Sequence, residues 1–319
     1  MASADTPPPD CLPFLDDVRA GLAADPPQLA PKYFYDAVGS RLFDRITELD
    51  AYYPTRTERG ILQDNVDAMV DAIGPDAVLI EYGSGSSDKT RILLDALAAR
   101  APLAAYVSVD ISAEHLDATA ADLRAAYPDL TVVPIAADYS APIPLPDLPA
   151  HERRVVFFPG STIGNSDPDE ATAFLGRMGD AAGTDGAMLV GVDQRKDPAV
   201  LVRAYDDPEG VTAAFNRNVL RRMRDELGAR LDLSGWTHQA RWNADAGRIE
   251  MHLVADGPQT IAIGDDRFAF ADGDSVWTES SYKYTPDGLA RLAAAAGLRR
   301  TERWTDAQDW FAVELYTHE

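Results

Sequence analysis

The sequence has very little cysteine and no long apolar run. Cys11 is the only cysteine in 319 residues, so an intrachain disulfide is impossible and a reducing, cytoplasmic setting is expected. No run of about 18 apolar residues occurs, and the first ten residues lack the apolar stretch of a secretory signal. We therefore expect a protein that neither spans a membrane nor is exported.

Basic charge is also scarce. Lysine and arginine number 29 against 52 aspartates and glutamates, which gives a formal net charge of −23. Nucleic acids and anionic membranes bind basic patches, so neither is expected as a partner, and small neutral or zwitterionic substrates remain open. The five histidines are scattered, and none pairs with Cys11 or another histidine at metal-ligand spacing, so we predict no metal. We expect a monomer.

The most informative segment is Val78–Arg91, V-L-I-E-Y-G-S-G-S-S-D-K-T-R. It has the pattern of a buried strand, a glycine turn and a helix that begins near Ser87 or Asp88. Gly83 and Gly85 can take positive φ and let the backbone approach a ligand, while the first helical N–H groups point into the same space. This pattern is typical of a nucleotide-like cofactor site, although an ordinary strand-to-helix turn would look the same.

A third glycine is missing from this turn, because Asp88 stands where the dinucleotide fingerprint G-x-G-x-x-G requires it. This absence weakens the case for a dehydrogenase. Glu81 ends the strand, and a carboxylate beside the turn would repel a pyrophosphate but suit a cationic or hydroxyl-rich group. The turn therefore favours S-adenosylmethionine over NAD.

The hydrophobic content of 46% is that of a globular protein. Between residues 77 and 193, apolar runs alternate with helical stretches, the pattern of βαβ crossovers. The predicted strands are Ala77–Tyr82, Ala105–Asp110, Leu130–Ala136, Arg154–Phe158 and Ala187–Asp193. The predicted helices are Thr90–Arg100, Ala113–Ala126 and Asp169–Ala182. We predict an α/β fold with a doubly wound, Rossmann-like sheet.

Ligands of such sheets bind beyond the carboxyl ends of the strands. Asp110 follows Gly83 by 27 residues, close to where an acid meets ribose hydroxyls, and Asp138 could accept from an adenine amino group. The fourth strand leads into Gly160–Asn165. A single aspartate at a strand end is more often a turn former or a helix cap. Acids at successive strand ends favour a cofactor site.

The pattern changes after the fifth strand. Residues 197–227 look helical, and alternating runs over 249–284, separated by D-G-type turns, predict an antiparallel sheet. The first 58 residues look mostly helical. We predict one domain of residues 59–196 and 284–319 that contains the doubly wound sheet, and a second, smaller α+β domain of residues 1–58 and 197–283.

Several collinear segments together resemble one family, the histidine-specific, S-adenosylmethionine-dependent methyltransferases that make hercynine in ergothioneine biosynthesis. The resemblance runs from about residue 31 to the C-terminus. Its segments are Pro31–Leu49, Ala51–Glu58, Glu81–Arg91, Pro159–Asn165, Arg203–Leu220, Arg248–Met251 and Thr278–Lys283. The order of so many motifs is more specific than any one of them.

The resemblance implies three successive methyl transfers to the α-amino nitrogen of L-histidine, which give N-alpha-trimethylhistidine (hercynine) and S-adenosylhomocysteine. It implies cofactor contacts at the strand ends, with the methionine part at Gly83 and Lys89, the ribose at Asp110 and the adenine at Asp138; we add Gly85 and Gly160. It also implies that the domain of residues 59–196 and 284–319 is the methyltransferase domain, which binds S-adenosylmethionine, and that the smaller domain of residues 1–58 and 197–283 is the substrate-binding domain, which holds the amino acid. The substrate residues are Tyr35, Tyr52, Asn165 and Tyr205 around the carboxylate and amine, and Met251, Glu279 and Ser281 around the imidazole.

The chemistry of these side chains suits the implied reaction. Methyl transfer from a sulfonium mainly requires alignment of a neutral amine with the methyl carbon. We expect Tyr35, Tyr52 and Asn165 at the reacting amine, since Asn165 can accept from it and tyrosines can donate to the carboxylate. Glu279 and Ser281, two residues apart in a strand, would serve the two ring nitrogens and so reject apolar side chains.

Ordinary structural roles compete with these assignments, and the resemblance alone favours function over them. The competing roles are packing for Tyr35 and Tyr52, core for Met251, a solvated strand face for Glu279 and plain surface charge for Lys89 and Lys283. Tyr282 and Gln194 depart from the family pattern. Two other functions remain open: N-methylation of another amino acid such as tryptophan, and non-catalytic binding of S-adenosylmethionine.

Overall fold

The structure, a computed structural model, describes residues 12–85, 87–111, 113–139, 141 and 143–319. The chain divides into two compact units. The seven-stranded unit comprises Pro54–Arg195 and Tyr282–Glu319. The insertion unit comprises the described part of Met1–Tyr53 together with Lys196–Ser281.

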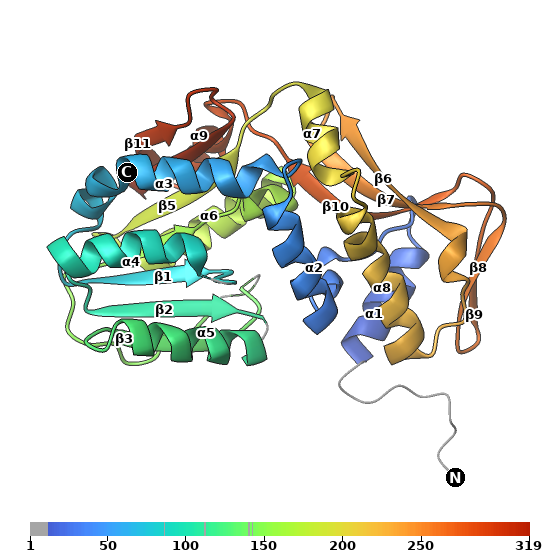
Figure 1. The fold of residues 1–319 in the computed structure, drawn as a ribbon, viewed down its shortest axis with the longest axis horizontal. Helices are drawn as coiled ribbons and strands as arrows, with labels where there is room; N and C mark the ends of the chain where they lie inside the picture. The colour runs from blue at the N-terminus through green and yellow to red at the C-terminus, as the bar shows by residue number, and fades with distance from the viewer. Residues whose placement is uncertain (1–11, 86, 112, 140, 142) are drawn as a thin grey trace, which may run out of the picture. The chain divides into compact units, whose positions relative to one another are not determined.

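The seven-stranded unit is built on one sheet of strand order β11-β12-β5-β4-β1-β2-β3 (Figure 1). Its strands are β1 (Ala77–Tyr82), β2 (Ala105–Asp110), β3 (Thr131–Ala136), β4 (Arg153–Phe158), β5 (Ala187–Asp193), β11 (Leu298–Thr305) and β12 (Phe311–His318). Neighbours among β1 to β5 are parallel, whereas β12 is antiparallel to both β5 and β11. The prediction of a doubly wound α/β sheet is confirmed.

Helices cover both faces of this sheet, which explains why β1 and β5 are buried along their whole length. The helices are α3 (Tyr53–Ile73), α4 (Asp88–Arg100), α5 (Ala113–Ala126), α6 (Pro168–Ala182) and α9 (Gly288–Ala295). Leu79 and Phe157 of the sheet share a buried cluster with Leu62 of α3 and Leu94 of α4. Side chains alternate across a strand, so Phe158 points to the other face. There its ring centroid lies 5.0 Å from that of Phe174 in α6.

The strand order reverses between β1 and β4. From β1 the chain proceeds through β2 to β3 on one side, and β4 and β5 lie on the other. The described residues of 137–152, which connect β3 to β4, form neither helix nor strand. The turn that begins at Gly83 and the loop that begins at Pro159 therefore follow neighbouring strands at the reversal, where sheets of this type bind ligands.

The insertion unit combines helices with two small sheets. Its helical segments are α1 (Leu12–Leu22), η2 (Pro31–Phe34), α2 (Ala37–Glu48), α7 (Pro198–Tyr205), α8 (Val211–Leu227) and η4 (Leu233–Gly235). Its strands are β6 (Trp236–Asn243), β7 (Arg248–Ala255), β8 (Gln259–Ile263), β9 (Asp266–Phe270) and β10 (Ser275–Tyr282), whose last residue belongs to the other unit. The sheet orders are β10-β7-β6 and β8-β9, and β6 with β7 and β8 with β9 pair antiparallel.

The sequence did not indicate two features of this unit. Residues 197–227 are helical as expected, but they form two helices, because Asp206–Gly210 contains a proline and a glycine at φ +72° that a helix interior does not accommodate. Strand β6 was not predicted at all. Only Trp236 and Ala240 along it are buried, so its sequence W-T-H-Q-A-R-W-N lacks the apolar alternation of a half-buried strand.

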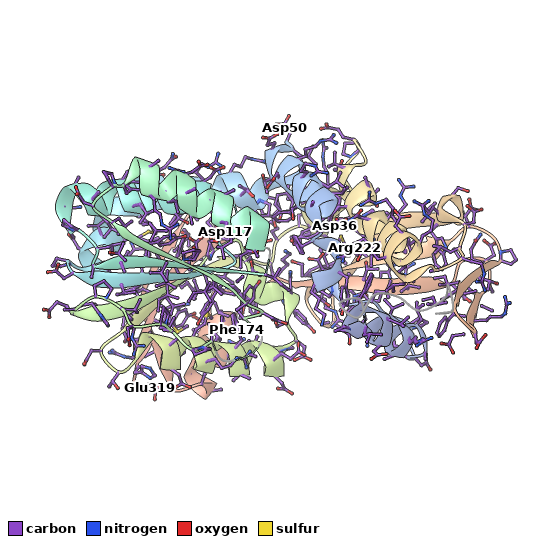
Figure 2. The ribbon with its side chains drawn as sticks, turned by 90° about the horizontal axis from the view of Figure 1, so that it is seen from below. Asp36, Asp50, Asp117, Phe174, Arg222 and Glu319 are labelled. Carbon is purple, nitrogen blue, oxygen red and sulfur yellow. The ribbon has the colours of Figure 1, made fainter. Side chains whose placement is uncertain are left out.

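The start of α2 is tied to α8 by one carboxylate. Asp36 caps α2 by accepting the N–H of Gly39 at 2.7 Å, and it also accepts from Nδ2 of Asn218 at 2.7 Å and from Arg221 at 2.9 Å. Arg222, labelled beside Asp36 in Figure 2, donates to the carbonyl of Tyr33 at 2.9 Å. These bonds hold η2 and the first turn of α2, which flank Tyr35, on α8.

Candidate cofactor and substrate sites

The glycine turn after β1 has the backbone expected from its sequence. Gly83 and Gly85 have φ of +71° and +47°, and a Cβ added at Gly85 would meet nothing within 4 Å. The N–H of Gly85 donates to Oδ2 of Asp110 at 3.2 Å, and the N–H of Gly83 donates to the carbonyl of Val109 at 2.8 Å. The turn and the carboxylate of Asp110 thus lie together at the end of β2.

Tyr139, which directly follows Asp138, lies against the same turn. A Cβ added at Gly83 would lie 3.6 Å from the Tyr139 hydroxyl oxygen. Burial, followed by the charges of Asp110 and Asp138, raises the pKa of this hydroxyl to about 12, so at neutral pH it remains a hydrogen-bond donor. Tyr139 was not expected from the sequence. An aromatic residue next to a strand-end aspartate was the available signal.

Glu81 does not have the position that we expected. Its carboxyl group is buried beneath the turn, where it accepts from the hydroxyl of Thr90 at 2.6 Å and from the hydroxyl of Tyr106. Burial raises the pKa of Glu81 to about 7. Its side chain points to the same face of β1 as that of Leu79, the face covered by α3 and α4, because the two residues are two positions apart in the strand. Glu81 therefore supports the turn from within the unit.

Lys89 is half-buried and forms an ion pair with a buried carboxylate. Its Nζ donates to Oε2 of Glu58 at 2.6 Å, and the Glu58 side chain is fully buried. Glu58 also accepts the N–H of Gly160, which lies 2.9 Å from each carboxylate oxygen. Lys89 is thus not a plain surface charge. Glu58 ends the resembling segment Ala51–Glu58 but was assigned no role there; its carboxylate joins α3, α4 and the loop after β4.

Besides its bond to Glu58, the loop Pro159–Asn165 makes close contacts with two other segments of the unit. Gly160 and Ser161 have φ of +82° and +58°, and Oγ of Ser161 accepts the N–H of Asp193 at 2.9 Å. A Cβ added at Gly164 would lie 2.7 Å from the carbonyl oxygen of Tyr282, so Gly164 allows close backbone contact. Asn165 ends the short helix η3 (Thr162–Asn165). The loop therefore presents both Gly160 and Asn165 from a fixed backbone.

In the insertion unit, four of the predicted substrate residues belong to one group of contacts. The Tyr205 hydroxyl lies 2.8 Å from Oγ of Ser281, and its ring centroid lies 5.9 Å from that of Tyr52. The ring centroid of Tyr52 lies 6.5 Å from that of Phe43, and the ring centroid of Phe43 lies 5.7 Å from that of Tyr35. Aromatic rings at these distances and near-perpendicular angles attract one another edge to face. Residues separated by about 250 positions in the sequence thus form one aromatic and hydroxyl-bearing cluster.

Met251 and Glu279 lie on the neighbouring strands β7 and β10. Met251 is buried, and its carbonyl accepts from the hydroxyl of Thr278 at 2.9 Å. Glu279 is half-buried, and its carbonyl accepts from Nε1 of Trp277 at 2.9 Å. Glu279 and Ser281 stand two residues apart within β10, so their side chains leave the strand on the same side.

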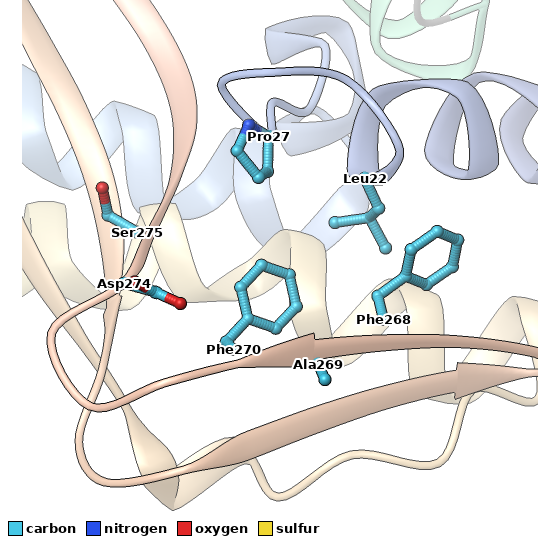
Figure 3. A pocket seen from close by; sticks show the side chains of 7 residues that line it. All are labelled: Leu22, Pro27, Phe268, Ala269, Phe270, Asp274 and Ser275. Carbon is cyan, nitrogen blue, oxygen red and sulfur yellow. The ribbon is translucent and has the colours of Figure 1, made fainter.

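The insertion unit also contains a pocket of about 360 Å³ (Figure 3). Leu22, Pro27, Phe268, Ala269, Phe270, Asp274 and Ser275 line it. None of the predicted site residues is among them. Its polar groups already have partners, since Asp274 accepts the N–H of Ala271 at 2.7 Å and Ser275 Oγ lies 3.3 Å from Nδ1 of His252. We assign this pocket no role.

The described residues contain neither a metal cluster nor a membrane span. Nowhere among them do three or more histidine, cysteine, aspartate or glutamate side chains gather as a metal site would require. Of the helices formed by these residues, none is both long and apolar enough to cross a membrane.

Comparison with known proteins agrees with the resemblance read from the motifs. The chain is 44% identical over 301 residues to the histidine N-alpha-methyltransferase of Mycolicibacterium smegmatis, covering 94% of this chain and 93% of that protein. It is 30% identical to ergothioneine biosynthesis protein 1 of Neurospora crassa, over 89% of this chain and 32% of that longer protein. A 4-dimethylallyltryptophan N-methyltransferase of Penicillium roqueforti is 28% identical, over 91% of this chain and 89% of that protein.

A family model described as histidine-specific, S-adenosylmethionine-dependent methyltransferase matches residues 14–318, nearly the whole chain. The match spans the glycine turn with Asp110, the loop with Asn165 and the cluster around Tyr205 and Ser281. We conclude that the chain belongs to the family of histidine-specific, S-adenosylmethionine-dependent methyltransferases.

Proposed function

We propose that this protein transfers three methyl groups from S-adenosylmethionine to the α-amino nitrogen of L-histidine and so makes hercynine for ergothioneine biosynthesis. The observation that carries the proposal is the 44% identity, over 94% of the chain, to a histidine N-alpha-methyltransferase. The contact between Tyr205 and Ser281 supports it, because two residues expected at the substrate lie within hydrogen-bond distance.

The seven-stranded unit has the features that the methyl donor requires. The positive φ of Gly83 and Gly85 and the open space at Gly85 leave room for a ligand against the backbone. In our proposal Asp110 accepts from the ribose hydroxyls, and Asp138 accepts from the adenine amino group. The methionine part of the cofactor contacts Lys89, which Glu58 orients, and the loop that contains Gly160. The bound cofactor supplies an electrophilic methyl group on a sulfonium.

The protein's task in the transfer is alignment. A carbon–nitrogen bond forms as the sulfur–methyl bond breaks, S-adenosylhomocysteine leaves, and the amine must lose a proton before each of the three attacks. We assign Asn165 to accept a hydrogen bond from the amine, and Tyr35, Tyr52 and Tyr205 to hold the carboxylate and amine end. The product carries a fixed positive charge, and tyrosine faces near it would contribute about 0.5–2 kcal/mol each.

Selectivity for histidine would come from β7 and β10. Glu279 would accept from one imidazole N–H and Ser281 would serve the other ring nitrogen, with Met251 packed against the ring. A substrate without these nitrogens would leave buried polar groups unpaired, a cost of about 1–3 kcal/mol for each group. An indole has only one N–H and needs more room, which disfavours tryptophan.

A substrate survey tests the proposal directly. The protein is incubated with labelled S-adenosylmethionine and each of the twenty amino acids in turn, and products are identified by mass. We expect trimethylated product with histidine alone. Label on tryptophan, or label on no amino acid, would overturn the assignment.

A single substitution tests the imidazole site. Glu279→Ala should raise the KM for histidine far more than the KM for S-adenosylmethionine, because it removes an acceptor for the substrate alone. Glu250→Ala is a matched control on the neighbouring strand β7, since Glu250 bonds to Arg248 at 2.7 Å within the unit. If Glu279→Ala changed neither KM, Glu279 would not contact the imidazole.

The remaining expectations belong to the same proposal. A net charge of −23 supports a small zwitterionic substrate and disfavours nucleic acid as a partner. We propose a cytoplasmic monomer. Sedimentation equilibrium across a range of protein concentrations would test the monomer, and a dimer mass would contradict it.

A further inference from the structure

His238 lies in β6, the strand that the sequence did not reveal, and its side chain is 1% exposed. Its Nε2 lies 2.7 Å from the carbonyl oxygen of Tyr205, and its Nδ1 lies 2.8 Å from Nδ2 of Asn216. All three residues belong to the insertion unit. Both ring nitrogens of a buried histidine are therefore engaged, one of them by the backbone of a residue assigned to the substrate.

Asn216 determines which ring nitrogen carries the proton. Its side chain also lies 3.2 Å from the carbonyl oxygen of His252, and because a carbonyl only accepts, the amide atom facing it is the nitrogen. The same nitrogen donates to Nδ1 of His238, which must then hold a lone pair. The proton of the neutral ring is consequently on Nε2, where it donates to the carbonyl of Tyr205.

The carbonyl of Tyr205 needs such a donor because Tyr205 is the last residue of α7. The final carbonyls of a helix have no N–H of their own helix to accept from. His238 supplies a donor from another element at the helix end. The side chain of Tyr205 then projects to Ser281, with its hydroxyl 2.8 Å from Oγ, and its ring faces Tyr52.

We propose that His238, protonated at Nε2 and oriented by Asn216, is a positioning residue that fixes Tyr205 for substrate binding. This inference rests on the proposed function, because it takes Tyr205 to contact the amino acid substrate. His238 itself touches neither substrate nor cofactor. It acts through the backbone of Tyr205, so its loss shifts the tyrosine hydroxyl relative to Ser281 without removing either group.

The surroundings of His238 keep the ring neutral. Burial is the main cause that lowers its pKa, and it outweighs the hydrogen bond to the Tyr205 carbonyl and the nearby carboxylates of Asp206 and Asp207. Asp206 lies 4.0 Å away and is the closer of the two, and Arg217 opposes protonation. A protonated ring would place an N–H against the amide N–H of Asn216, which the geometry does not accommodate.

Two amide substitutions separate positioning from bulk packing. Glutamine can place its amide nitrogen near the position of Nε2, whereas asparagine is one methylene shorter and cannot reach the Tyr205 carbonyl. We expect His238→Asn to raise the KM for histidine about five- to tenfold, in line with the loss of one buried hydrogen bond. His238→Gln should recover most of that loss. The Kd for S-adenosylhomocysteine should stay within about twofold of the wild-type value in both variants.

A double-mutant cycle with Tyr205→Phe supplies the decisive readout. If His238 acts through Tyr205, His238→Asn should raise the histidine KM by less than about twofold in the Tyr205→Phe background. Equal effects of His238→Asn in both backgrounds, or equal KM values for the Asn and Gln variants, would overturn the proposal. Should His238→Asn not fold, Asn216→Ala replaces it in the cycle, because it removes the donor that selects the tautomer.

Failure of this inference differs from failure of the proposed function. Wild-type protein that methylates no histidine contradicts the function itself. Wild-type protein that methylates histidine while the variants keep its KM contradicts only the role of His238.

Discussion

Lys283 and Asp193 form an ion pair inside the seven-stranded unit, with Nζ 2.8 Å from Oδ2 and both side chains fully buried. Asp193 ends β5, and Lys283 directly follows β10. The carbonyl of Asp193 accepts the N–H of Tyr284 at 2.9 Å, and its N–H donates to Ser161. The alternative that Lys283 is a plain surface charge is therefore wrong. The ion pair thus joins the end of β5, which also bonds to the Gly160 loop, to the segment that begins at Tyr282, where the chain returns to the seven-stranded unit.

Lys283→Met should destabilise the protein by about 3–5 kcal/mol, because it leaves the carboxylate of Asp193 buried without its counter-charge. Replacing both partners in Asp193→Leu/Lys283→Met removes the buried charge altogether, and much of the loss should return. Chemical denaturation of the two variants and the wild type measures the difference. A double variant no more stable than Lys283→Met would show that the ion pair does not account for the cost.

Gly164→Ala should destabilise the Pro159–Asn165 loop, because its Cβ would lie 2.7 Å from the carbonyl oxygen of Tyr282 and one of the two backbones must move. Overpacking of this kind costs about 1–3 kcal/mol. Gly176→Ala in α6 is the matched control. There a Cβ meets only Ala296 at 3.9 Å, so alanine should stabilise the helix by about 0.5–1 kcal/mol. Thermal unfolding of both variants checks the opposite signs.

Glu58→Ala should cost about 1–3 kcal/mol of unfolding free energy, because the N–H of Gly160 loses its acceptor and Lys89 loses its buried partner. Arg59→Ala, one position along the same helix, removes only an exposed contact 4.0 Å from Asp88 and should change stability by less than about 1 kcal/mol. The affinity for S-adenosylhomocysteine should fall in Glu58→Ala alone. Equal affinity in the two variants would contradict the role of Glu58 in orienting Lys89.

Glu81 should make stability depend on pH. Its pKa is raised from 4.5 to about 7 in the folded protein, so between these values the folded state binds more protons than the unfolded state. The stability that the protonated carboxyl contributes is complete below pH 4.5 and is lost as the pH rises through 7. Glu81→Gln removes this titration. Relative to wild type, the variant should gain on the order of 3 kcal/mol between pH 4.5 and pH 8.

Unfolding free energies of wild type and Glu81→Gln at the two pH values provide the measurement. Glu302→Gln is the control, since Glu302 is exposed on β11 and its carboxyl is solvated in the folded and unfolded states alike. A difference between wild type and Glu81→Gln that stays constant with pH would show that the buried carboxyl is already ionised at low pH.

The parallel core was predictable because its information is local. The runs at 77–82, 105–110 and 187–193 match β1, β2 and β5 residue for residue, since strands buried on both faces are continuous apolar segments. The glycine turn was predictable for the same reason. Strand β6 was not predictable, because few of its residues are buried. The break between α7 and α8 was not predicted either, because the short segment D-D-P-E-G lies between two stretches that both have a helical pattern.

The candidate sites were predictable only in part. The family resemblance proposed Tyr52, Tyr205 and Ser281 as substrate residues, which stays a prediction, and the tertiary structure joins the three in one cluster. No sequence pattern assigned a role to Glu58 or His238, although Glu58 ends the resembling segment Ala51–Glu58. Their importance lies in partners that are distant along the chain: Glu58 contacts Lys89 and Gly160, 31 and 102 residues away.

The sequence by itself determined the doubly wound sheet, the glycine turn and the family, because apolar periodicity, glycine chemistry and ordered motifs are properties of neighbouring residues. The tertiary structure alone decided that Glu81 is buried beneath the turn, that Lys283 neutralises Asp193 and that His238 holds Tyr205. Each of these depends on packing between distant segments. A charge or ring nitrogen removed from water must find a partner wherever the fold provides one, and no local pattern specifies where that is.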